Sequence, residues 1–319
     1  MMMASSTSSP VERAALLLLL SVAACTSTGS TADAGTSEDA GAPVVADLQA
    51  QSNVGRAIAA LAWRPATMEV AVGQSGALDI RELSGAIVRG FAVAAGQVSA
   101  AAFNVDGTTL ATGGQNNPLK VWDATNSEAI ATLSDTVFPI RAVSYSPSGL
   151  LAASLSNNTI KVFQGTTPTT INQQATTLTF QDDNALVVGS ADGMIRRYGP
   201  TSGIMVGSFQ AHSGGVTAVA VDPAVGIASV GGDRKMRLSR INGDVVKEWD
   251  LPGDPTCVTL TGQKVVAGTY DGTVAVGNAE NGVFGTFTAS STPVRAVVSQ
   301  GSTVVMGMED GTLAVWTLR

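Results

Sequence analysis

A short phrase recurs seven times along this chain, and no other feature of the sequence constrains the fold as strongly. Each copy has small strand-like residues ending in Gly or Ser, a tight turn, and an apolar-x-apolar run that often ends in an aromatic residue. The copies read VGQSGALDIR (72–81), TGGQNNPLKVW (112–122), ASLSNNTIKVF (153–163), VGSADGMIRRY (188–198), VGGDRKMRLS (230–239), AGTYDGTVAVG (267–277) and MGMEDGTLAVW (306–316). Their spacing of 35–42 residues is typical of a four-stranded propeller blade.

A second strand-like run precedes each phrase, so that each repeat predicts a hairpin. These runs lie at 57–63, 98–103, 140–145, 175–180, 216–221, 256–260 and 294–298. Both kinds of strand are rich in Ala, Val, Leu and Gly, as expected when both faces of a sheet are buried. The sequence therefore predicts an all-β fold, a seven-bladed β-propeller. The expected turn positions are Gly76, Asn117, Asn158, Gly193, Lys235, Gly272 and Gly311.

The last phrase ends at 316, only three residues before Arg319, so the seventh blade needs an outer strand from elsewhere in the chain. Residues 43–49 (PVVADLQ) form a short apolar segment that no repeat uses. We expect this N-terminal strand to close the last blade, because closure removes an exposed sheet edge.

The repeats resemble the WD-repeat family, most plainly at Val121-Trp122-Asp123 and in the segment HSGGVTAV that begins at His212. The resemblance extends over residues 44–319 through the seven phrases. It implies a hydrogen-bonded set of His, Ser or Thr, Asp and Trp in each blade, yet no blade has all four. The fifth has His212, Ser229 and Asp233, but Ser239 stands where Trp belongs. The resemblance also identifies four structural turn aspartates, which are Asp192, Asp233, Asp271 and Asp310.

The same resemblance implies a rigid disc that binds proteins or peptides and performs no catalysis. Family members usually make contacts through the residue before the turn aspartate and through the beginning of the innermost strand. Carried over to this chain, the candidate binding residues are Gln115, Ser156, Tyr270, Glu309, Arg141, Thr217 and Arg295. Tyr and Arg are the residue types that most often anchor interfaces, so Tyr270, Arg141 and Arg295 are the strongest of these candidates.

The sequence offers little for catalysis or for a metal site. A catalytic triad or a zinc site needs His near Ser, Cys or carboxylates, and the chain has one His, His212. The DG pairs lie in hairpin turns and do not form a calcium loop. We therefore expect no metal and no cofactor. Two alternatives stay open: an outer-membrane assembly factor, and a propeller hydrolase, lactonase-like enzyme or carbohydrate-binding propeller.

The distribution of charge argues against nucleic acid as a partner. The net charge is -7, four acidic residues lie in 26–50 with no basic residue, and the remainder is nearly balanced. Four basic residues occupy the middle x of the apolar-x-apolar runs, where we expect packed stems and solvated heads. They are Lys120, Lys161, Arg196 and Arg237. A small anionic contact at Arg234, Lys235 and Arg240 stays open as an alternative.

The N-terminal segment has the pattern of an export signal. Residues 14–24 (AALLLLLSVAA) are uncharged but too short to cross a bilayer as a helix, as expected for a secretory signal peptide. The following residues, Val22-Ala23-Ala24-Cys25, resemble a bacterial lipobox, which implies that the Cys25 thiol accepts diacylglycerol. We therefore expect a lipoprotein signal peptide at residues 1–24.

Residues 25–42 contain Ser, Thr, Gly, Ala and acidic residues but no Val, Ile, Leu or aromatic residue, which predicts a flexible tether after Cys25. The propeller then occupies residues 43–319. Thr26 follows the cysteine in place of the aspartate that retains lipoproteins at the inner membrane in enteric bacteria, so the expected location is the outer membrane. Cys257 lies in an apolar strand and is expected to be a core residue.

Overall fold

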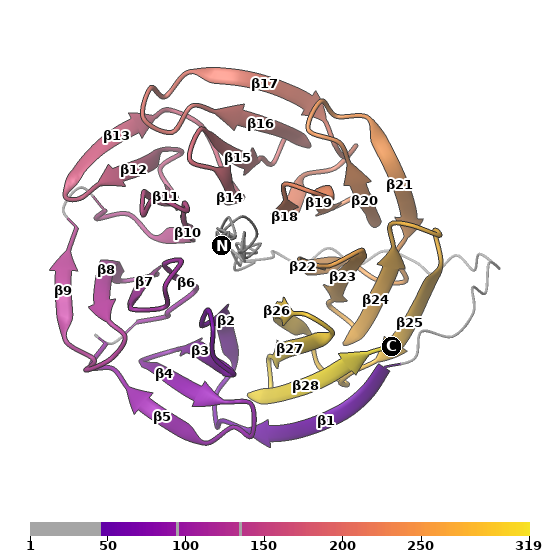
Figure 1. The fold of residues 1–319 in the computed structure, drawn as a ribbon, viewed down its shortest axis with the longest axis horizontal. Helices are drawn as coiled ribbons and strands as arrows, with labels where there is room; N and C mark the ends of the chain where they lie inside the picture. The colour runs from indigo at the N-terminus through magenta and orange to yellow at the C-terminus, as the bar shows by residue number, and fades with distance from the viewer. Residues whose placement is uncertain (1–45, 94–95, 134–135) are drawn as a thin grey trace, which may run out of the picture.

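The fold confirms the predicted seven-bladed β-propeller. The computed structural model describes residues 46–93, 96–133 and 136–319. Within these ranges 28 strands form seven antiparallel sheets of four strands, arranged as blades around a central axis (Figure 1). The predicted signal peptide, Cys25 and the tether lie outside the described residues. Over those ranges, no helix is long and apolar enough to cross a membrane.

Each blade runs from an innermost strand at the axis to an outer strand at the rim (Figure 1). In the order of blades 1 to 7, the innermost strands are β2 (Ile58–Trp63), β6 (Ala100–Phe103), β10 (Ile140–Tyr145), β14 (Thr177–Asp182), β18 (Val216–Asp222), β22 (Pro255–Thr261) and β26 (Val294–Gln300). The second strands are β3 (Glu69–Gln74), β7 (Thr109–Gly114), β11 (Leu151–Leu155), β15 (Ala185–Gly189), β19 (Gly226–Gly231), β23 (Lys264–Thr269) and β27 (Thr303–Met308).

The outer half of each blade carries the other two strands. The third strands are β4 (Ala77–Glu82), β8 (Asn117–Asp123), β12 (Ile160–Gln164), β16 (Met194–Tyr198), β20 (Lys235–Ser239), β24 (Thr273–Asn278) and β28 (Thr312–Leu318). The outer strands are β5 (Ile87–Gly90), β9 (Ala129–Thr132), β13 (Thr167–Ile171), β17 (Met205–Gln210), β21 (Val245–Asp250), β25 (Phe284–Thr288) and, in blade 7, β1 (Ala46–Asn53).

The N-terminal strand closes the ring, as predicted. Strand β1 pairs antiparallel with β28, from Ala46 opposite Leu318 to Asn53 opposite Thr312. The strand is longer on its C-terminal side than the predicted segment 43–49, of which residues 43–45 lie outside the described residues. The added residues are Ala50 and the polar run 51–53. This run gives no strand signal, because an outer strand exposes much of its surface.

The core is divided among the blade interfaces. Seven clusters of buried apolar residues occur, and each one joins two neighbouring blades. Ile58 and Leu61 of blade 1, for example, pack with Val298 and Leu313 of blade 7. Since burying one such side chain stabilises a fold by about 1.5–3 kcal/mol, the ring is held mainly by packing between blades. Cys257 is a buried part of this core, and burial raises the pKa of its thiol to about 11.

The turn between the second and third strands contains one residue with positive φ in every blade. In five blades it is at the position that the repeat predicts. In blades 2 and 5 it is Asn116 and Arg234, one residue before the predicted Asn117 and Lys235. A register shift between Thr112 and Gly114 displaces the turn in blade 2. In blade 5 the turn is set by Asp233, which precedes Arg234 as Asp192 precedes Gly193.

The connectivity gives the disc two different faces. The turns between second and third strands share one face with the connections that lead from each outer strand to the next innermost strand. We call this the upper face. The lower face carries the turns between first and second strands and between third and outer strands.

Candidate functional site

All seven candidate binding residues lie on the upper face. Four are in turns between second and third strands, and these are Gln115, Ser156, Tyr270 and Glu309. The other three are Arg141, Thr217 and Arg295, each the second residue of its innermost strand. The register shifts at each of these three positions. A β-bulge of this kind redirects one side chain out of the ladder, here at the upper end of the strand.

Three other blades place a hydroxyl at the equivalent position and use it to join the ring. Ser99 donates to Ile140 O at 3.2 Å and Thr176 to Val216 O at 2.6 Å. Thr256 donates in the same way to Val294 O. Each bond runs from one blade to the innermost strand of the next blade. The long arginine side chains at Arg141 and Arg295 therefore occupy positions where other blades have short hydroxyls that bond neighbouring backbone.

The structure brings Tyr270, Arg295 and Glu309 together, and we call these three residues the upper-face cluster. The Arg295 guanidinium lies 5.2 Å from the centroid of the Tyr270 ring, within range of a cation–π interaction. Its Nη2 donates to Glu309 Oε2 at 2.7 Å. The Tyr270 side chain is 48% exposed. An exposed ring beside an arginine that is already held in place has the features of an interface anchor.

Charged residues extend this cluster toward blade 5. Tyr270 N donates to Asp254 O at 2.8 Å. The Asp254 carboxylate accepts in turn from Arg234 Nε at 2.7 Å. Blades 5, 6 and 7 thus present an arc in which acidic and basic groups alternate around one exposed tyrosine. The sequence motifs did not reveal Asp254, because it lies in a connection between blades and not in a repeated turn.

The remaining candidate residues belong to blades 2, 3 and 5 and are not part of this cluster. Gln115 is exposed, whereas Ser156 and Arg141 are half-buried. The repeat motifs do not include two apolar residues on the same side of the disc, Val137 and Phe138, which are 86% and 46% exposed in the connection before β10. The sequence signal that could have revealed this exposed apolar pair is an apolar dipeptide in a loop.

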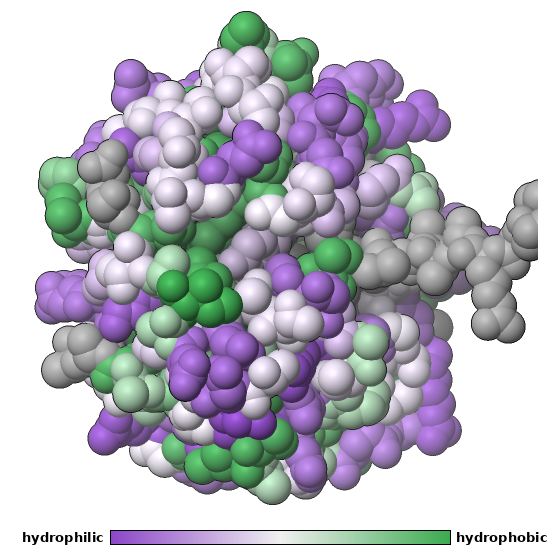
Figure 2. Space-filling model, turned by 60° about the vertical axis from the view of Figure 1, so that its left-hand side comes forward, coloured by the Kyte–Doolittle hydropathy of each residue, from purple (hydrophilic) through white to green (hydrophobic). Residues whose placement is uncertain are grey.

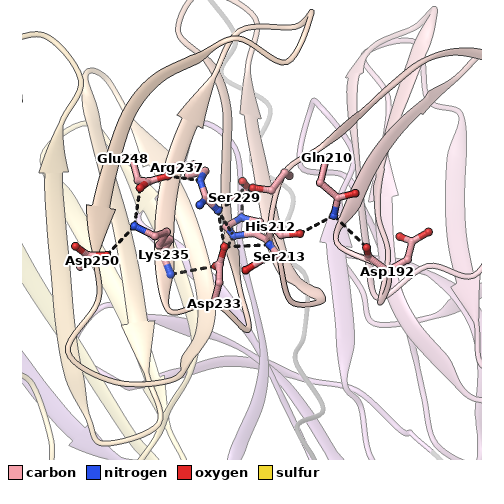
Figure 3. Close-up of polar contacts among 11 residues, drawn as sticks. Asp192, Gln210, His212, Ser213, Ser229, Asp233, Lys235, Arg237, Glu248 and Asp250 are labelled. Atoms are coloured by element: carbon pink, nitrogen blue, oxygen red, sulfur yellow. Dashed lines mark hydrogen bonds and ion pairs between the residues drawn. The ribbon is translucent and has the colours of Figure 1, made fainter. Parts of the chain in front are cut away.

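Blade 5 holds the only histidine of the chain in a buried polar network (Figure 3). His212 Nδ1 lies 2.7 Å from Asp233 Oδ1, and His212 Nε2 lies 2.9 Å from Ser229 Oγ. Because the carboxylate is only an acceptor, Nδ1 donates to Asp233 and the Ser229 hydroxyl donates to Nε2. Gly231 makes room for the ring, since a Cβ there would collide with it.

These three residues have the connectivity of a Ser-His-Asp catalytic triad, but the serine is inaccessible. Ser229 is 0% exposed and His212 is 1% exposed, so a substrate carbonyl cannot reach the hydroxyl. The network instead ties the segment before β18 to the β19–β20 hairpin.

Arg237 completes this network and differs from the prediction. Its Nη1 donates to Asp233 Oδ2 at 2.7 Å and to Ala211 O at 2.8 Å, and its Nε donates to Glu248 at 2.6 Å. The side chain is only 12% exposed, so the expectation of a solvated head is wrong at this position. The nearby buried carboxylate explains the difference, because it pairs with the guanidinium.

Burial has opposite effects on the two titrating partners in this network. It lowers the pKa of His212, although the hydrogen bond from His212 to Asp233 acts to raise that pKa. Burial would raise the pKa of Asp233, but hydrogen bonds from Arg237 and His212 outweigh this effect and hold the pKa at about 2.

We expect the free energy of unfolding to fall as the pH is lowered from neutrality. In the unfolded chain His212 regains a pKa of about 6.5 and binds a proton that the folded chain excludes, so stability is lost below that pH. Asp233 acts in the same direction at lower pH, because its stabilisation is lost as the pH falls toward about 2. Urea unfolding near pH 7 and pH 5 checks this. A His212→Gln variant with an unchanged pH dependence would contradict it.

Blade 2 has the tryptophan that blade 5 lacks from the set of His, Ser or Thr, Asp and Trp. Trp122 Nε1 donates to Thr112 Oγ1 at 2.8 Å. The indole also packs edge-on against Phe91 with 5.7 Å between centroids. Asp123 caps the following turn by accepting from Thr125 N at 2.7 Å. Trp122 lies at the position that Ser239 has in blade 5, so neither blade has the full set.

The turn aspartates share one geometry. Asp192, Asp233, Asp271 and Asp310 each accept a hydrogen bond from the backbone N–H two residues further on. This contact fixes the hairpin turn locally. The described residues contain no group of three or more His, Cys, Asp or Glu side chains arranged to hold a metal ion.

Comparison with known proteins agrees with this architecture. The family model of the WD domain, G-beta repeat, matches residues 88–123 and 203–238. Each match runs from the outer strand of one blade through the first three strands of the next blade. A search of curated proteins finds no match. The two matched repeats contain the Trp122 pair and the His212 network, and the ring has seven four-stranded blades. The chain is a seven-bladed β-propeller in which two repeats match the WD-repeat family.

Proposed function

We propose that this chain is a non-enzymatic binding platform of the bacterial cell envelope, held at the outer membrane by a lipid on Cys25. WD-repeat propellers commonly act as protein-interaction scaffolds. In this chain we assign the binding role to the upper-face cluster. The observation that carries the proposal is the exposed Tyr270 ring beside Arg295, which Glu309 holds in position. Such an arrangement lowers the entropy that the arginine loses on binding.

The partner is expected to be a protein or peptide and not a nucleic acid. Affinity for nucleic acid depends on basic groups that are free to contact phosphates. On this face Arg234 and Arg295 pair with Asp254 and Glu309, and Lys235 pairs with Glu248. The sequence left open an anionic contact at Arg234, Lys235 and Arg240, and these pairs argue against it because they engage two of its three basic groups.

The lipid anchor is supported by the sequence of residues 14–25, and its test is separate from the test of partner binding. We expect the mature chain from a bacterial host to begin at Cys25 with diacylglycerol on its thiol. Mass spectrometry of the N-terminal peptide measures this directly. A Cys25→Ser variant should keep its first 24 residues. A wild-type chain that keeps the leader or lacks lipid would contradict the anchor and leave partner binding untouched.

We expect Tyr270→Ala and Arg295→Ala each to weaken partner binding at least about tenfold, as removal of an interface anchor does. The experiment recovers envelope proteins with the detergent-solubilised full chain and then measures the affinity of the partner recovered. Met68→Ala is the control, because Met68 is 59% exposed in a lower-face turn. If the control weakens binding and the two upper-face variants do not, the binding site is on the other face.

A further inference from the structure

Every outer strand of the propeller is the edge of a sheet. A strand with one neighbour presents unpaired N–H and C=O groups that can pair with another chain, and proteins block such pairing with charges, proline, bulges or short strands. On the part of the rim that Figure 2 brings forward, exposed apolar residues form separate patches divided by polar ones. The outer strands differ in how many of these protective features they carry.

Six of the seven outer strands carry at least one such feature. The register is shifted in five of them, which are β1, β5, β9, β17 and β21. Strands β5 and β9 have only four residues. Charged residues lie on β1, β5 and β21. Strand β13 has a regular register but contains Pro168.

Strand β25 has none of these features. Its sequence, FGTFT, contains no charge and no proline. It pairs with β24 through five consecutive residues without a register shift, from Thr273 opposite Thr288 to Gly277 opposite Phe284. Phe284 and Phe287 turn toward the core, where Phe287 packs on Trp316 with 4.6 Å between ring centroids. Thr286 and Thr288 are exposed, so the edge is regular, rich in β-forming residues and accessible.

The sequence of β25 and its flanks is uncharged as well, although Lys247 Nζ of blade 5 lies beside Gly282, two residues before the strand begins. Residues 281–294 contain no acidic or basic side chain. The third strand of this blade has Ala275 at the position where blades 2 to 5 have Lys120, Lys161, Arg196 and Arg237. A strand that approaches β25 therefore meets no charge from β24 or β25.

The alternation of the ladder defines which backbone groups point outward. Ala289 N donates to Gly272 O. By the alternation of an antiparallel ladder, Phe287 and Gly285 then form backbone hydrogen bonds with the residues opposite them on β24. The N–H and C=O groups of Phe284, Thr286 and Thr288 are then directed away from β24. They form an edge whose centre is Thr286.

From this geometry we infer that β25 is a dimerisation edge, which pairs antiparallel with β25 of a second copy of this chain about a twofold axis at Thr286. The edge is complementary to itself. Thr286 lies opposite the same residue of the second copy, and cross-strand Thr–Thr pairs are favourable. No like charges come together, although the net charge of each copy is negative. Phe284 lies opposite Thr288, so both ends of the pairing are equivalent, as a twofold interface requires.

The dimer is expected to be weak. Five paired residues bury less than the roughly 1,200 Å² of a standard stable interface, so dissociation constants in the micromolar range are expected. This interface is separate from the upper-face cluster, because β25 lies on the rim (Figure 1). A failure of dimerisation would therefore leave the proposed binding function unaffected.

Sedimentation velocity of the full chain in detergent, over a range of concentrations, tests the inference. We expect reversible self-association that Thr286→Lys weakens at least about tenfold, as a buried like-charge pair does at a twofold axis. The control is Gln51→Lys, because Gln51 lies opposite Ala314 as Thr286 lies opposite Ala275. This control variant should self-associate like the wild type.

A second variant gives a positive readout that does not depend on loss of binding. Thr286→Cys should form a disulfide between two copies under mild oxidation, and mass spectrometry should identify the peptide that joins position 286 of both copies. A wild-type chain that stays monomeric up to about 100 μM overturns the inference. Dimerisation that Thr286→Lys and Gln51→Lys weaken equally also overturns it. The same holds if the introduced thiol forms its disulfide with a different protein and not with a second copy of this chain.

Discussion

Replacing Asp233 by alanine is expected to lower the free energy of unfolding by about 3 kcal/mol, because the substitution breaks a buried ion-pair network. The Asp233 side chain is 8% exposed. It accepts hydrogen bonds from His212, from Arg237 and from two backbone N–H groups. Its loss leaves the His212 Nδ1–H without an acceptor in a buried site and leaves Arg237 with only Glu248 as an ionic partner.

The neighbouring blade provides a matched control. Asp192 occupies the same turn position and pairs with Arg196 at 2.5 Å, but its side chain is 50% exposed. An exposed pair of this kind contributes less than about 1 kcal/mol, so Asp192→Ala should have a small effect. Asp233→Asn should lie between the two alanine variants, because it keeps the size and one acceptor of the side chain.

Denaturant unfolding of the three variants measures these differences directly. Equal losses for Asp233→Ala and Asp192→Ala would show that the buried network is no more important than an ordinary turn. That result would also remove the basis of the pH dependence expected from His212.

Deleting β1, residues 46–53, is expected to have the largest effect of any change considered. The deletion removes the pairing of β1 with β28 and uncovers apolar residues between blades 6, 7 and 1, including Trp316 and Leu313. We expect a loss of about 5 kcal/mol or more, which is a large part of the 5–15 kcal/mol that stabilises an ordinary domain. The variant should therefore unfold at a much lower temperature or aggregate through the exposed edge of β28.

A deletion of equal length in the predicted tether serves as the control. Removing residues 26–33 shortens the chain by the same number of residues, but it leaves β1 and its pairing intact. Thermal unfolding followed by circular dichroism should give the wild-type midpoint for this control. If both deletions leave the midpoint unchanged, β1 does not stabilise the ring.

The architecture could be predicted because each blade repeats the same sequence pattern. A small-residue strand, a turn and an apolar-x-apolar strand occur seven times, and only a ring lets every copy bury both faces against a neighbour. The closing strand was also predictable, because 43–49 was an apolar segment after the predicted tether that no repeat used. Its C-terminal limit was not, because Gln51, Ser52 and Asn53 continue the register with β28 without an apolar pattern in the sequence.

The candidate site could be predicted only in part. The repeat placed Tyr270, Arg295 and Glu309 on one face, since equivalent positions of a repeat share a face. Their contact depends on side-chain conformations in neighbouring blades, which the spacing does not define. The burial of Arg237 was missed for the same reason, because it depends on contacts with Asp233 and Glu248 that the repeat position does not define. The weak protection of β25 becomes visible only when the registers of all outer strands are compared.

The pairing of the first strand with the last one tests the central claim, a closed ring of seven blades, most directly. Gln51 and Ala314 lie opposite each other. The hydrogen bond from Val54 N to Gly311 O shows which pairs of this ladder are hydrogen-bonded, and by alternation Gln51 and Ala314 share no backbone hydrogen bond. The Cα atoms of such a pair are about 4.5 Å apart, which is close enough for a disulfide. In a Gln51→Cys, Ala314→Cys variant, peptide mapping should find an intramolecular disulfide between these two positions. Two free thiols after oxidation of the folded protein would contradict the closed ring.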